Sequence, residues 1–74
     1  MDSVYHKNYV SLGLNIAFYR KKKGLTQAQL AEKLNISLSH VGGIEQGKHS
    51  AALDLIWKIC DILEIPPEDL FTFR

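Results

Sequence analysis

The stretch that decides the fold is LTQAQLAEKLNISLSHVGGIEQGK, residues 25–48. It begins with a capping box, because the Thr26 hydroxyl can accept from the third backbone N–H of a helix while Gln29 reaches back to the Thr26 N–H. Asn35 tolerates the left-handed conformation and can end that helix. The pattern therefore predicts a helix over about 27–34, followed by a turn of about three residues.

A second helix follows directly, over about residues 38–46. Ser37 can cap its start and Gly47 stops it, while Val41 and Ile44 recur at the spacing of an inward face. Two helices joined by so short a turn form a helix-turn-helix. In such a unit the outer face of the second helix stays exposed, and a DNA major groove is wide enough to accept it.

The rest of the chain also carries helical signals. We expect one helix over about 9–23, another over about 52–63, and a short helix that starts at Pro67. Residues 1–8 are polar and unpatterned, which predicts a flexible arm. The residues expected to face the core are Leu12, Ile16, Tyr19, Leu30, Ala31, Leu34, Leu53, Ile56, Cys60 and Leu63, and the short last helix contains Leu70 and Phe71. The sequence therefore predicts an all-α domain of five short helices over residues 9–74.

Composition excludes several classes of protein. The chain has 74 residues, the length of one domain, and its single cysteine, Cys60, forms neither an internal disulfide nor a zinc site by itself. No apolar stretch approaches the ~18 residues that span a bilayer, and the N-terminus does not resemble a signal peptide. We therefore expect a cytoplasmic protein, where a lone thiol stays reduced.

The sequence does not predict an enzyme. Its histidines, His6, His40 and His49, are scattered, and no Ser/His/Asp set, phosphate-binding glycine loop or paired carboxylates can be recognised. We therefore expect no metal, no cofactor and no small-molecule ligand.

Charge is unevenly distributed along the chain. Residues 1–37 carry six Lys and Arg against two Asp and Glu, whereas residues 38–74 carry three against six, so the balances are +4 and −3 within a net charge of +1. This asymmetry favours one basic side that faces a polyanion. The alternative is that the run over residues 20–23 is an ordinary solvated helix end, where cations complement the helix dipole.

The run over residues 25–37, followed by Ile-Glu-Gln-Gly-Lys at 44–48, resembles the Cro/cI-type (XRE) helix-turn-helix family. The similarity extends from about residue 12 to about residue 71. It implies a five-helix, lambda-repressor-like fold, sequence-specific binding of double-stranded DNA, and a role in transcription regulation, most often repression.

The resemblance also implies roles for single residues. Gln27 matches a position that grips a phosphate, together with the backbone N–H groups at a helix start; the alternative is a plain surface glutamine. Arg20 and Glu45 match an ion pair that ties the first helix to the recognition helix. The implied base-facing residues are Leu38, Ser39, Gly42 and Gly43, and the further implied phosphate contacts are Lys48, His49 and Ser50, unless these are ordinary solvated residues.

Gly42 and Gly43 depart from what a recognition helix usually carries. Each glycine in a helix interior costs ~1 kcal/mol relative to alanine, and neither has a side chain to read bases. Leu38 could still touch a thymine methyl group, and Ser39 and His40 keep polar groups. Three explanations stay open: close approach of the bare backbone to DNA, readout of DNA shape, or a fold that has lost DNA binding.

The C-terminal third has more apolar residues than one small core needs. They are Leu55, Trp57, Ile59, Ile62, Phe71 and Phe73. We expect a two-fold homodimer through the last helix and the outer face of the preceding one, with Leu55, Trp57, Phe71 and Phe73 at the interface. It would bind a palindromic site; alternatively, Trp57 packs against the N-terminal arm.

A protein-interaction module on the same fold, antitoxin-like or an antirepressor, is the alternative function. The sequence does not indicate the operator, the regulated genes, or the choice between repression and activation.

Overall fold

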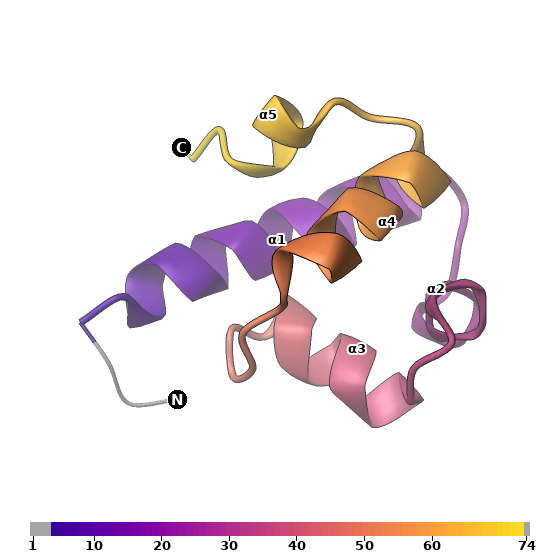
Figure 1. Ribbon diagram of the computed structural model, residues 1–74, viewed down its shortest axis with the longest axis horizontal. Helices are drawn as coiled ribbons and strands as arrows, with labels where there is room; N and C mark the ends of the chain where they lie inside the picture. Colours follow the sequence, from indigo (N-terminus) through magenta and orange to yellow (C-terminus); the bar gives the residue numbers. More distant parts are fainter. Residues whose placement is uncertain (1–3, 74) are drawn as a thin grey trace.

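The computed structural model describes residues 4–73, which fold into five helices without any strand (Figure 1). The helices are α1 (His6–Lys22), α2 (Gln27–Leu34), α3 (Leu38–Glu45), α4 (Leu53–Leu63) and α5 (Pro67–Leu70). The predicted all-α, five-helix architecture is thus confirmed. None of the helices within the described residues is long and apolar enough to cross a membrane.

The long helix α1 lies through the middle of the molecule, with α3 on one side of it and α5 on the other (Figure 1). Helices α2 and α3 pack against each other, and α4 contacts α1, α2 and α5. Helix α3 therefore rests on the central helix α1, whereas α2 rests on α3 and α4, and α5 lies on the other side of α1.

Capping chemistry sets the bounds of α2 and α3. The Thr26 hydroxyl accepts from the Gln29 N–H at 3.0 Å, and the Thr26 N–H donates to the Gln29 side-chain oxygen at 2.8 Å, as predicted. Asn35 ends α2 in the left-handed conformation with φ 58°. The Ser37 hydroxyl then accepts from the His40 N–H at 3.0 Å and starts α3.

Helix α1 begins earlier than the sequence predicted. Residues 6–8, assigned to the flexible arm, are helical, and the N–H groups of Asn8 and Tyr9 donate to the Tyr5 carbonyl at 3.0 and 3.1 Å. The apolar pattern missed this turn because residues 6–8 face solvent and need no apolar side chains. Residues 1–3 of the predicted arm lie outside the described residues.

The core is a single apolar cluster at the centre of the bundle. Its members are Leu12, Ile16, Leu30, Ala31, Leu34, Val41, Ile44, Ile56, Ile59, Cys60, Leu63 and Leu70. Two expectations for α4 are wrong: Leu53 is 61% exposed, whereas Ile59, expected on the outer face, is 1% exposed. The inward stripe runs from Ile56 to Leu63 at helical spacing, so Leu53 lies one turn beyond the part of α4 that covers the core.

Candidate nucleic-acid interface

The face of α3 that points away from the core is free. Val41 and Ile44 are buried beneath the helix, and the small Ala31 of α2 lies in the same core cluster. On the outer side, Leu38 is 53% exposed and Ser39 is also exposed. Helix α3 is therefore anchored along one side and accessible along the other.

Arg20 of α1 and Glu45 at the end of α3 form a buried, two-point ion pair. Arg20 Nε donates to Glu45 Oε2 at 2.6 Å and Nη2 donates to Oε1 at 3.1 Å, while Nη1 donates to the Leu25 carbonyl at 2.8 Å. The guanidinium thus connects α1, the segment before α2, and α3. Planar guanidinium groups suit such a site because several N–H donors lie in fixed directions.

Gln27 joins this network, which the sequence did not predict. Its Nε2 donates to Glu45 Oε1 at 2.9 Å, so the carboxylate accepts from two side chains on two different helices. One of the two N–H bonds of the Gln27 amide is thereby committed to Glu45. The other N–H and the amide oxygen are left for the outer edge of α2, where a phosphate contact was implied.

The two central glycines of α3 have different surroundings. A Cβ added at Gly42 would meet no atom within 4 Å, whereas one at Gly43 would lie 1.8 Å from Cδ2 of His49 and 2.6 Å from its Nε2. Gly43 is therefore buried under the His49 ring, and its predicted base contact stays a prediction. Only Gly42 keeps an open outer side.

A shallow hollow of about 360 Å³ surrounds Gly42. It is lined by Gln27, Leu38, Ser39, Gly42, Gly43, Gln46, Lys48 and His49. The hollow thus brings together most of the implied DNA contacts and adds Gln46, which the sequence reading did not single out. Gln46 lies one turn beyond Gly42, as Leu38 lies one turn before it, so its helical spacing could have identified it. Ser50, an implied phosphate contact, lies in the loop outside this lining and is exposed.

The basic run at the end of α1 is not directed to one surface. Arg20 points inward to Glu45, and the Lys23 ammonium contacts the Glu64 carboxylate beyond the end of α4. Hydrogen bonding and the positive charge of Lys23 lower the pKa of Glu64 below its usual value. At least half of the run therefore serves ion pairs within the fold, and Lys48 is the cation in the lining of the hollow.

Cys60 is part of the core and not of any reactive site. Burial, followed by the charges of Asp61 and Asp69, raises the pKa of the thiol, which keeps it protonated. Among residues 4–73, no three His, Cys, Asp or Glu side chains gather as they would around a metal ion.

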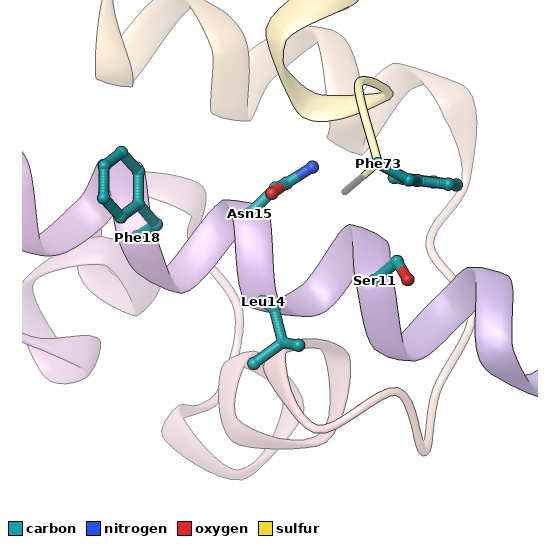
Figure 2. Close-up of a pocket in the computed structure, with 5 residues that line it drawn as sticks. All are labelled: Ser11, Leu14, Asn15, Phe18 and Phe73. Atoms are coloured by element: carbon teal, nitrogen blue, oxygen red, sulfur yellow. The ribbon is translucent and has the colours of Figure 1, made fainter.

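A second exposed surface is apolar and lies on the α5 side of α1. A shallow pocket of about 240 Å³ lies there. Figure 2 shows its lining residues on α1 and on the chain that follows α5. The pocket is lined by Ser11, Leu14, Asn15, Phe18 and Phe73. Asn15 Nδ2 donates to the carbonyls of Leu70 at 2.8 Å and Thr72 at 3.1 Å, which holds the C-terminal segment against α1.

The predicted interface residues differ in exposure. Trp57, Phe71 and Phe73 remain 45%, 46% and 42% exposed, whereas Leu55 is half-buried against the core. Val4 of the N-terminal arm is almost fully exposed, so this residue does not cover Trp57.

Comparisons with known proteins match this geometry. The family model described as Helix-turn-helix matches residues 16–70. An uncharacterised HTH-type transcriptional regulator of Methanocaldococcus jannaschii is 36% identical over 59 residues, covering 80% of this chain and 89% of that protein. The immunity repressor protein of Bacillus phage phi105 is 36% identical over 56 residues, covering 76% of this chain and 39% of the repressor.

Among solved structures, the restriction-modification controller protein C.AhdI from Aeromonas hydrophila superposes with a TM-score of 0.86 at 33% identity. That alignment covers 93% of this chain and 100% of C.AhdI. The part of the chain that the family model matches includes α2, the turn, α3 and the C-terminal part of the central helix, over residues 16–22.

Proposed function

We propose that this chain, which belongs to the Cro/cI-type helix-turn-helix family, represses transcription. The members of that family are transcription regulators and not enzymes. The proposed repressor acts in the cytoplasm as a homodimer bound to a palindromic DNA site. One observation carries the proposal: the outer face of α3 is free while its inner face is fixed to α1 and α2. A helix held in this way can enter a major groove without rearrangement.

Contacts at the ends of α2 and α3 would set the orientation on DNA. The start of α2 supplies free backbone N–H groups and the second N–H of Gln27, and both suit a phosphate. Lys48 adds a cation beyond the end of α3. Base readout falls to Leu38 and Ser39 in the first turn of α3, with Gly42 allowing the backbone to approach the base edges.

The homodimer is supported by the second, apolar surface. A chain of 74 residues is marginally stable alone, and exposed aromatic side chains are typical of protein interfaces. Phe73 lines the same pocket as Leu14 and Phe18 of α1 (Figure 2), and we therefore include these two residues of the central helix in the proposed interface. A two-fold dimer would place two copies of α3 about 34 Å apart, on successive turns of DNA.

Selection of bound duplexes from a random pool tests DNA recognition. We expect a symmetric consensus whose half-sites lie about one helical turn apart, and an affinity that falls steeply as salt rises. Lys48→Ala should lower the affinity for all sequences alike and reduce the salt slope by about one. A folded chain that binds no duplex even at low salt would instead support the protein-interaction module.

Sedimentation of an interface variant tests the dimer. Phe73→Lys should give a monomer at concentrations where the unmodified chain is a dimer, because a buried ammonium at a two-fold contact opposes itself. Leu53→Lys is the matched control, since Leu53 is also exposed and apolar but lies outside the pocket. If both variants remain dimeric, the interface lies elsewhere.

A further inference from the structure

We propose that His49 is a base-reading residue that supplies, from the loop after α3, the side chain that Gly43 lacks. The inference rests on the proposed function and assigns to His49 a role different from the implied phosphate contact. It would make His49 a specificity-determining residue of the recognition surface.

The first observation is where the His49 ring lies. Its Cδ2 is 1.8 Å from the position that a Cβ on Gly43 would take, so the imidazole starts where a side chain at position 43 would start. The Gly43 carbonyl accepts from the N–H groups of Lys48 at 2.8 Å and His49 at 3.2 Å. These bonds fold the loop back onto the end of α3 and place the ring on the helix.

The second observation is that the ring has a defined position. His40 of α3 packs against it edge to face, with ring centroids 5.9 Å apart and an interplanar angle of 76°. The His49 side chain is nevertheless exposed, and it borders the hollow around Gly42 on one side and a smaller group of Ser37, Ser39 and His40 on the other. It therefore lies between the two polar parts of the outer face of α3.

Position and chemistry together favour a base over a phosphate. A phosphate contact needs only a donor near the DNA backbone, which the flexible Lys48 can provide, whereas base readout needs a donor held at a fixed place. An imidazole N–H can donate to N7 of a purine, or to O6 of guanine, in the major groove. We therefore expect His49 to select a purine at one position of each half-site.

Duplex selection with three variants separates the two roles. His49→Ala should lose the preference at one position per half-site, by about 5- to 100-fold against the wrong base pair, while the other positions and the half-site spacing persist. His49→Phe keeps a ring on Gly43 but has no N–H, so it should lose the same preference while the chain keeps its thermal stability. Lys48→Ala should keep every preference and lose affinity uniformly.

The variant Gly43→Ala tests independently whether the base preference requires the His49 ring to lie on Gly43. The new methyl group should displace the His49 ring and reduce the same preference as His49→Ala does. In the His49→Ala background, Gly43→Ala should reduce this preference no further, because the ring that it displaces is already absent.

Two results would overturn the inference alone: a uniform loss of affinity with an unchanged consensus in His49→Ala, or a preference that survives in His49→Phe. If the unmodified chain selects no consensus, the proposed function fails and the inference fails with it.

Discussion

Two ion pairs involve residues at the C-terminal end of α1 that lie three positions apart in the sequence. One pair belongs to the recognition region around α3, and the other belongs to the α4–α5 region. Arg20–Glu45 fixes the recognition helix α3, and its side chains are 8% and 5% exposed. Lys23–Glu64 connects the end of α1 to the end of α4, and its side chains are 37% and 72% exposed. The recognition region therefore depends on a buried polar network, whereas the α4–α5 region depends on apolar packing.

The difference follows from what each region must do. A purely apolar contact between α1 and α3 would tolerate small shifts, but the Arg20–Glu45–Gln27 bonds hold only one placement of α3. A buried carboxylate is tolerated because it is fully hydrogen-bonded, and no buried side-chain polar atom among the described residues lacks a partner. The α4–α5 region has no comparable buried network and leaves the aromatic side chains of Trp57 and Phe71 exposed.

Removing one partner of the buried pair should have the largest effect. Glu45→Ala leaves the Arg20 guanidinium buried without a counter-charge, which should lower the free energy of unfolding by about 3–5 kcal/mol. Urea denaturation measures this loss. Glu64→Ala is the control and should change stability little, because solvent screens an exposed pair. A loss below about 1 kcal/mol for Glu45→Ala would contradict the contrast between the two regions.

The two neighbouring glycines of α3 provide a second test of the recognition region. Gly42→Ala should raise the free energy of unfolding by up to ~1 kcal/mol, because alanine favours a helix and its methyl group meets no atom within 4 Å. The same methyl group should weaken binding to the selected duplex by about 1–3 kcal/mol where the helix packs closely against DNA. Thermal unfolding and DNA titration of one variant measure both effects.

If Gly42→Ala raises the free energy of unfolding and lowers the DNA affinity, then glycine at this position makes the helix less stable but allows DNA to approach it closely. An unchanged DNA affinity would instead show that DNA does not enter the hollow around Gly42.

Local signals in the sequence predicted the framework of the fold. The Thr26–Gln29 capping box, the left-handed Asn35 and the Ser37 cap act within a few residues, so the bounds of α2 and the start of α3 could be predicted from neighbours alone. The start of α1 could not be predicted in this way, because its first turn has neither an apolar pattern nor a side-chain cap. Propensity alone does not mark such a solvated turn.

The details of the candidate site depend on contacts between distant residues. Gln27 and Glu45 are 18 residues apart, and their bond exists only after α2 and α3 have packed. The His49 ring lies against Gly43 because the loop after α3 folds back onto the helix. A glycine pair in a sequence indicates missing side chains, but it does not say which of the two is open and which is covered.

The smallest expected effect concerns the exposed pair and its dependence on pH. Lys23 holds the pKa of Glu64 below its usual value of 4.5, so the pair contributes stability above that value and loses it as the pH falls through the lowered pKa. Glu64→Gln keeps the side-chain shape at this left-handed position, with φ 57°, and removes only the charge. We expect Glu64→Gln to be slightly less stable than the unmodified chain at neutral pH and low salt, and equally stable at pH values well below the lowered pKa or in about 1 M salt. Thermal melts across pH measure the difference, and a gap that persists in acid would mean that Glu64 acts through packing and not through its charge.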